Sequence, residues 1–87
     1  MLVTIENVED IGRVTRSVRR AQGIRQDDLG FMSDCSHKYV VDVEKGKPTI
    51  QMGKLIRLLS ELGVEVVLKI PDDMELDELR VSLRDSA

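Results

Sequence analysis

One short segment limits how this chain can fold. Residues 64–70 read VEVVLKI, with Val64, Val66, Leu68 and Ile70 on one face of an extended segment and Glu65, Val67 and Lys69 on the other. This alternation is typical of a half-buried β-strand. A single strand must pair with another strand. The candidates are the short β-rich stretch of residues 1–5 and the same segment of a second copy in a symmetric dimer.

The rest of the chain has the hydrophobic spacing of helices. Apolar side chains recur at intervals of three and four over residues 8–22, after a candidate cap at Asn7, and over residues 50–62, after a candidate cap at Thr49. We expect one face of each helix to be buried. The inward positions are Ile11, Val14, Val18 and Ala21 in the first helix, and Met52, Leu55, Ile56, Leu59 and Leu62 in the last.

Two shorter helices are expected between these longer ones. The first covers residues 26–33, and the second is capped by Ser36 and runs to about residue 44. Asp34 and Cys35 form the tight connection, because Asp tolerates left-handed backbone angles better than most residues. The inward positions are Leu29, Met32, Val40 and Val43. Two short helices joined by a tight turn, between two longer helices, make a helix-turn-helix unit.

Composition excludes several classes of protein. With one cysteine, Cys35, and one histidine, His37, neither an intramolecular disulfide nor a four-ligand zinc site is expected, and no cofactor or metal is predicted. The chain has no HExxH motif and no glycine-rich phosphate loop, so we expect no enzyme activity. It also has no apolar run of roughly 18 residues and no signal sequence at its start. We therefore expect a cytoplasmic protein with no membrane partner.

Charge is unevenly distributed along the chain. The 13 basic and 16 acidic residues give a net charge of −3, which taken alone argues against a nucleic-acid partner. Residues 71–87 hold six of the acids and two of the bases, so residues 1–70 hold ten acids and 11 bases. We expect a mildly basic body and an acidic tail. Asp72 can cap a final helix in this tail, with Leu76, Leu79 and Leu83 as its apolar positions.

Residues 11–64 resemble the Cro/CI-type (XRE) helix-turn-helix family. The matching features are Arg16, Arg19 and Gly23, then Gln26-Asp27-Asp28-Leu29, then Ser36, Val40 and Val43, then EKGKPT at 44–49 and LLSELGV at 58–64. The resemblance implies a mostly α, lambda-repressor-like domain of four to five helices, with a C-terminal β-strand that pairs across a dimer. We divide the chain into an arm or short strand (1–7), a DNA-binding domain (8–63), a dimerisation strand (64–70) and an acidic helix or tail (71–87).

The resemblance also implies roles for individual residues. In this family the second short helix, here residues 36 to about 44, is the recognition helix that enters the DNA groove. Gln26 matches a glutamine that contacts phosphate. Arg19 and Glu44 match a partly buried ion pair that sets the angle of the recognition helix. Tyr39 either packs its ring inward or contacts the DNA backbone. The residues expected to contact DNA are Arg25, Gln26, Ser36, His37, Lys38, Tyr39, Asp42, Lys45 and Lys47. Those expected to pair across the dimer are Val64, Val66, Val67, Leu68 and Ile70.

Three positions depart from the family pattern. Arg25 stands where a Ser or Thr cap is usual, Gly30 replaces an alanine, and Asp34 replaces the glycine of the turn. Glycine costs about 1 kcal/mol relative to alanine inside a helix. We therefore expect a marginally stable second helix and modest DNA affinity.

Within the family, the chain is most similar to HipB-like antitoxins, through the loop GKPT and the run LLSELGVEVVL. This similarity implies a repressor that binds an inverted-repeat operator as a homodimer, autoregulates its operon and binds a HipA-like kinase toxin. The alternative is a stand-alone Cro/CI-type regulator, such as a phage or restriction-system controller, with no toxin partner. A third possibility is a protein-interaction module that has kept the fold.

Overall fold

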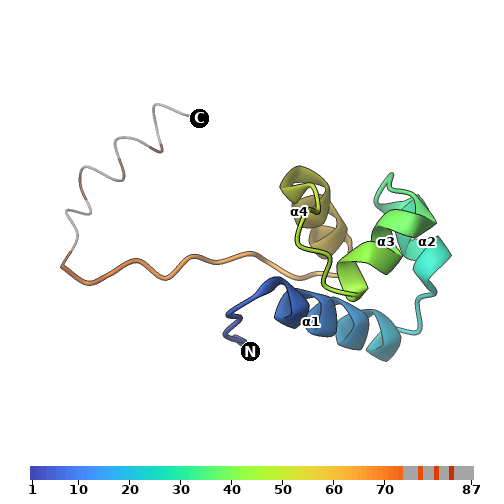
Figure 1. Ribbon diagram of the computed structural model, residues 1–87. Coiled ribbons are helices and arrows are strands. Elements are labelled where there is room, and N and C mark those ends of the chain that lie inside the picture. The colour runs from blue at the N-terminus through green and yellow to red at the C-terminus, as the bar shows by residue number, and fades with distance from the viewer. Residues whose placement is uncertain (74–76, 78–79, 81–82, 84–87) are drawn as a thin grey trace.

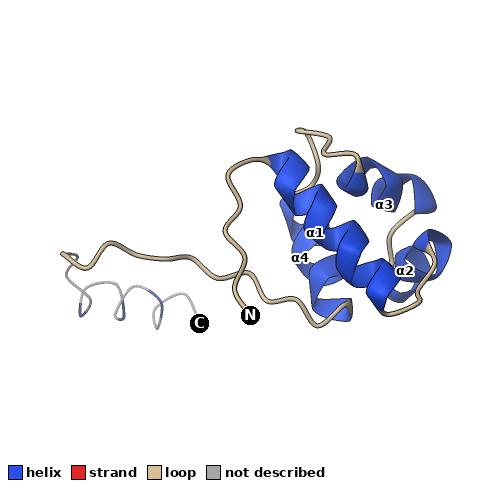
Figure 2. Cartoon of the chain, turned by 90° about the horizontal axis from the view of Figure 1, so that it is seen from below, coloured by secondary structure: helices blue, strands red, loops and turns tan. Residues whose placement is uncertain are grey.

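Four helices form the folded part of the chain. In this computed structural model, which describes residues 1–73 and positions 77, 80 and 83, the helices are α1 (Val8–Ala21), α2 (Gln26–Met32), α3 (His37–Glu44) and α4 (Met52–Glu61). All four were expected, with ends within two residues of the predicted ones. α3 packs against both α1 and α2, and α2 also contacts α4. Figures 1 and 2 show the helices gathered together, with the segment after α4 leading away from them.

The helix starts follow the predicted caps in two of three cases. The Asn7 side chain accepts a hydrogen bond from the backbone N–H of Asp10 at 2.8 Å, and Ser36 accepts one from that of Tyr39 at 3.0 Å. The predicted cap at Thr49 is wrong, since α4 begins after Gln51, which makes no side-chain cap bond. α2 likewise begins without a side-chain cap, as expected from Arg25 at that position.

The turn between α2 and α3 explains two of the departures from the family pattern. Asp34 has a φ of 56°, which is the left-handed conformation predicted for it. Gly30 faces the backbone of the turn, and a Cβ built on it would lie 2.8 Å from the carbonyl oxygen of Cys35. The same approach lets the Cys35 N–H donate to the Gly30 carbonyl at 2.8 Å. Glycine at this position therefore allows a closer turn than alanine would.

The core is made of leucine and valine. Its members are Leu29, Val40, Val43, Leu55, Leu58, Leu59 and Leu62, all at most 6% exposed. In α2 and α4, three residues expected to point inward do not: Met32, Met52 and Ile56 are 43%, 56% and 48% exposed. The buried face of α4 is thus turned from Ile56 toward Leu58, which lies in the same core cluster as Leu29 of α2.

The buried face of α1 agrees with the predicted one only in part, since Ile11 and Val18 pack against the core as expected. Gly12, Thr15 and Arg19 are buried, whereas Val14 is half-buried and Ala21 exposed. A Cβ on Gly12 would lie 2.6 Å from the carbonyl oxygen of Val43, so the missing side chain lets α1 and α3 approach closely. The Thr15 hydroxyl is satisfied within the helix, donating to the Ile11 carbonyl at 2.7 Å. Backbone proximity therefore decides which face of α1 is covered.

The predicted strands at 64–70 and 1–5 are not formed in this single chain. Within the described residues, both segments are non-helical and unpaired. Val66, Val67 and Leu68 are 46%, 62% and 80% exposed. A strand requires a ladder of hydrogen bonds to a neighbour, and these segments have none in one chain. Most of the helix expected after Asp72 falls outside the described residues. No described helix has the length and apolar character needed to cross a membrane.

Candidate nucleic-acid interface

α3 has one buried side and one polar side. Val40 and Val43 are fully buried, while Ser36, His37 and Lys38 are exposed. The eight residues of α3 span about 12 Å at 1.5 Å per residue. An α-helix with its side chains is about 10–12 Å across, so α3, with its polar outer face, can enter the DNA major groove, which is about 12 Å wide.

Two charged residues of α3, Lys38 and Asp42, form a cluster with Lys47 of the following loop. The Asp42 carboxylate lies 3.1 Å from the Lys38 ammonium and 3.6 Å from that of Lys47. The hydrogen bond from Lys38, with help from Lys47, holds the pKa of Asp42 below its ordinary value. Asp42 is therefore ionised at neutral pH. A phosphate or a base edge must compete with this carboxylate for either lysine.

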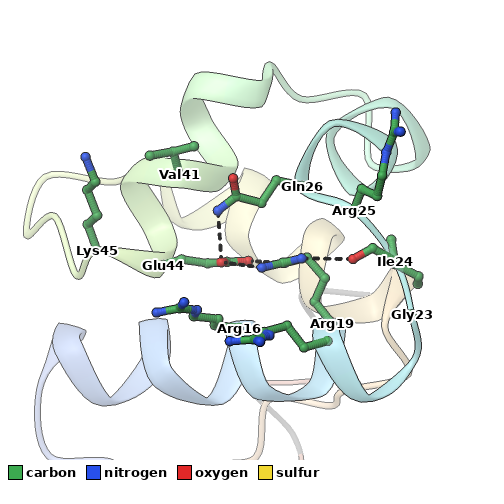
Figure 3. A pocket seen from close by; sticks show the side chains of 10 residues that line it. Arg16, Arg19, Gly23, Ile24, Arg25, Gln26, Val41, Glu44 and Lys45 are labelled. Atoms are coloured by element: carbon green, nitrogen blue, oxygen red, sulfur yellow. Dashed lines mark hydrogen bonds and ion pairs between the residues drawn. The ribbon is translucent and has the colours of Figure 1, made fainter.

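A buried ion pair joins α1 to the end of α3. Arg19 donates to the Glu44 carboxylate through Nε at 2.6 Å and through Nη2 at 3.0 Å, and their side chains are 11% and 4% exposed. Arg19 also donates through Nη1 to the Ile24 carbonyl at 2.9 Å (Figure 3). The hydrogen bond that Arg19 donates to Glu44 raises the pKa of Arg19. Arg19 thus links α3 to the segment that leads into α2.

Gln26 extends this network to the exposed face. Its amide nitrogen donates to the Glu44 carboxylate at 3.1 Å (Figure 3), and its amide oxygen lies 3.3 Å from His37 Nε2. Gln26 is in the first turn of α2, and His37 in the first turn of α3. The buried carboxylate of Glu44 therefore orients Gln26, which is predicted to contact phosphate, and Gln26 in turn contacts His37, which is predicted to contact DNA.

Two other predicted DNA-contacting residues have partners within the protein. Arg25 pairs with Asp27 at 2.8 Å, and its hydrogen bond lowers the pKa of that carboxyl. The Tyr39 ring packs against the core, and its hydroxyl donates to the Gln51 carbonyl at 2.6 Å. Burial raises the pKa of Tyr39. Tyr39 thus fixes α3 against the start of α4, with Lys54 Nζ 5.7 Å from the centre of its ring.

Two residues of this surface were not predicted from the sequence. Val41 is half-buried and lines the same cleft as Gln26 and Lys45 (Figure 3). Its spacing from Lys45, four residues along one helix, was a usable signal. Arg57 of α4 donates to the Ser33 carbonyl at 2.8 Å, which holds the turn before α3. No local pattern indicates that hydrogen bond. The described residues include no group of three His, Cys, Asp or Glu suited to a metal ion.

Comparison with known proteins identifies the family. The helix-turn-helix family HTH_3 matches residues 16–68. This chain belongs to the XRE-type helix-turn-helix family. The uncharacterized HTH-type transcriptional regulator y4mF of Sinorhizobium fredii is 37% identical to it over 73 residues, which cover 84% of this chain and 96% of that protein. This helix-turn-helix protein is therefore a DNA-binding transcriptional regulator.

Solved structures show the same fold. The restriction-modification controller C.AhdI of Aeromonas hydrophila is 29% identical, with a TM-score of 0.61 over 67% of this helix-turn-helix chain and 88% of its own. A chain of the HipA-HipB-O2-O3 complex is 14% identical, with a TM-score of 0.74 over 82% of this chain and 100% of its own. HipB bound to an O4 20mer gives a TM-score of 0.73 with the same identity and coverage. At 14% identity, the similarity to these HipB structures shows that the fold is shared.

Proposed function

We propose that this helix-turn-helix protein is a repressor that reads an inverted-repeat operator with α3. The observation that carries the proposal is the hydrogen-bonded series from Arg19 through Glu44 and Gln26 to His37, which orients the polar side of α3. His37 and Lys38 can donate to O6 and N7 of guanine, and Asp42 can accept from the amino group of cytosine. Gln26, Ser36, Lys45 and Lys47 contact phosphates at the groove edges.

The second part of the proposal is a homodimer formed through residues 64–70. Val66, Val67 and Leu68 are exposed in one chain, and the segment is extended and has no neighbouring strand among the described residues. The same segment of a second copy, with Val64 and Ile70 at its ends, would pair its backbone and cover these side chains. The two α3 helices would then lie about 34 Å apart, as an inverted repeat requires. Residues 8–63 are the DNA-binding domain in this arrangement, residues 1–7 an arm and residues 71–87 a tail.

In vitro selection from a random duplex library tests operator recognition. We expect an inverted repeat to be enriched, and we expect Lys38→Ala to relax selection at one base pair and cost about 1–3 kcal/mol of binding. Arg13→Ala is the matched control, because Arg13 is 73% exposed and its ion pair, among the described residues, is with Asp10 of its own helix. Equal affinity of the protein for selected and random duplex would refute the proposal.

Proline at Val67 tests the dimer. Proline has no backbone N–H and interrupts a β ladder, whereas threonine keeps the N–H and the branched side chain. We expect Val67→Pro to be a monomer in light scattering, with poor operator affinity, and Val67→Thr to remain a dimer. A dimeric Val67→Pro that retains full affinity would show that the copies associate elsewhere.

The finer proposal is that the repressor is the antitoxin of a HipA-like kinase. It is supported by the resemblance of residues 58–68 to HipB-like antitoxins and by the HipB-type fold, which covers 82% of the chain. The 29% identity to C.AhdI favours the second candidate, a stand-alone controller. An adjacent reading frame for a kinase-like protein, whose product co-purifies with this chain, would support the antitoxin. Repression by the chain alone, with no such neighbour, would support the controller.

A further inference from the structure

A cleft of about 760 Å³ opens beside the recognition helix, between the C-terminal half of α1, the segment leading into α2 and the end of α3 (Figure 3). We call it the α1 cleft. Five cationic side chains line it, and Glu44 is the one acid among its lining residues. The cations are Arg16, Arg19, Arg20, Arg25 and Lys45. The cleft therefore carries a strong positive charge.

Two of these cations have partners within the protein, and the other three have no ion pair with any residue that the structure describes. Arg19 forms an ion pair with Glu44 at 2.6 Å, and Arg25 forms one with Asp27 at 2.8 Å. Within residues 1–73, no ion pair is found for the remaining three, which are all exposed. These three are Arg16, Arg20 and Lys45. Their charge is available for an anion from outside the chain.

The position of the α1 cleft indicates which anion it meets. Gln26, Val41 and Lys45 belong both to the cleft and to the surface around α3. A hollow on the other side of α3 is also basic, with Lys47 and Lys54 in its wall. A helix in the major groove lies between two sugar-phosphate backbones. The two basic flanks of α3 match that arrangement.

We propose that the α1 cleft binds backbone phosphates of one DNA strand through Arg16, Arg20 and Lys45. This inference rests on the proposed function and adds to it two arginines of α1, a helix outside the helix-turn-helix unit. Guanidinium groups suit this task, because they can hold a phosphate through two parallel hydrogen bonds. The interaction would seat α1 on the backbone and so set how α3 enters the groove. It would supply affinity without reading sequence.

The two flanks of α3 differ in how free their cations are. On the far flank, Lys38 and Lys47 are engaged by Asp42 at 3.1 and 3.6 Å. A phosphate that meets Lys38 or Lys47 must displace a carboxylate, and Lys54 is the one cation of that flank with no ion pair among residues 1–73. In the α1 cleft, phosphates meet Arg16, Arg20 and Lys45 without such competition. The α1 cleft should therefore account for more of the salt-dependent affinity than the far flank does.

The test measures binding of Arg16→Ala, Arg20→Ala and the double variant to the selected operator and to random duplex, between 50 and 200 mM salt. Arg13→Ala is the control, since Arg13 lies on the same helix but outside the cleft and is 73% exposed. Each phosphate that a variant no longer neutralises, counted over both subunits, should lower the slope of log K against log salt by about 0.9. The double variant should weaken operator and random duplex by the same factor, so that their ratio is unchanged.

Two results would overturn the inference. In one, the double variant matches Arg13→Ala in both affinity and slope. In the other, it loses preference for the operator, which would assign Arg16 and Arg20 to base reading instead. Thermal unfolding of each variant shows that a loss of binding is not a loss of fold. Failure of the wild-type protein to prefer any selected duplex would instead refute the proposed function.

Discussion

Replacing Glu44 by glutamine should destabilise this small domain severely. The Glu44 carboxylate is 4% exposed and accepts three hydrogen bonds, two from Arg19 at 2.6 and 3.0 Å and one from Gln26 at 3.1 Å. Glutamine keeps the shape of the side chain but removes its charge. It also places an NH2 group where one acceptor oxygen now faces these donors. The Arg19 guanidinium, 11% exposed, is left without its counter-charge.

The expected cost of Glu44→Gln follows from that geometry. Removing one partner of a buried ion pair costs about 3–5 kcal/mol. Arg19 borders the open α1 cleft, where water screens part of its charge, so we expect the lower end, about 3 kcal/mol. A chain of 87 residues has a free energy of unfolding of about 4–13 kcal/mol at the usual value per residue. The variant should therefore lose a quarter or more of its stability, and its Tm should fall by about 12 °C or more.

Thermal and urea unfolding of Glu44→Gln, followed by circular dichroism, measure this cost. The matched control is Glu61→Gln, because Glu61 is an exposed glutamate at the end of α4. The double variant Arg19→Met with Glu44→Leu should recover much of the loss, because it leaves no buried charge unpaired. If Glu44→Gln unfolds at the same temperature as Glu61→Gln, the ion pair contributes no more than one at the surface, and our reasoning about α3 is wrong.

Two further predictions concern the helix packing and the charge cluster on α3. Gly12→Ala should lower the free energy of unfolding by about 1–3 kcal/mol, because the new Cβ would lie 2.6 Å from the Val43 carbonyl oxygen. Gly53→Ala, whose Cβ would have nothing within 4 Å, should raise the free energy of unfolding by up to about 1 kcal/mol. Equal unfolding midpoints for the two variants would contradict both predictions. The lowered pKa of Asp42 means that its interactions favour the folded state above the ordinary carboxyl range and are lost as the pH falls through the folded pKa. A carbon NMR titration should therefore place the Asp42 midpoint below that of an unfolded reference, and Lys38→Met should raise it.

Local signals predicted the helices because each has apolar spacing of the helical kind, which in α1 and α3 agrees with a side-chain cap. The Asn7 cap, the apolar spacing after it and the stop at Gly23 all indicate the same helix. The left-handed Asp34 could be predicted for a similar reason, since side-chain chemistry restricts the backbone there. These features depend on neighbours within a few residues, and a sequence displays such neighbours directly.

The choice of buried face could not be predicted in the same way. Met32 and Ile56 have apolar spacing as good as that of Leu58, yet the first two are exposed and the third is fully buried. The angle at which helices meet decides among them, and on α1 that angle depends on the close approach of Gly12 to a carbonyl of another helix. Spacing within one helix carries no record of such tertiary neighbours.

The contacts of the candidate site fall into the same two groups, those that local spacing predicts and those between residues distant in the sequence. Lys38 and Asp42 are four residues apart on one helix, so their pairing can be expected from spacing alone. Arg19 and Glu44 are 25 residues apart, and only resemblance to a family pointed to them. Arg57, which supports the turn from 24 residues away, had no such help and was missed.

The carboxylate of Asp42 has a consequence for how this protein would find its operator. A genome offers about 10⁶–10⁹ competing sites, and a regulator loses time on each one it holds too long. Because Lys38 and Lys47 already have a partner at 3.1 and 3.6 Å, random DNA gains little by displacing it. Only a site where the edge of a base donates a hydrogen bond to Asp42 would compensate for the contacts that the lysines give up. If α3 reads DNA as proposed, Asp42 would thus shorten each unproductive stop during the search.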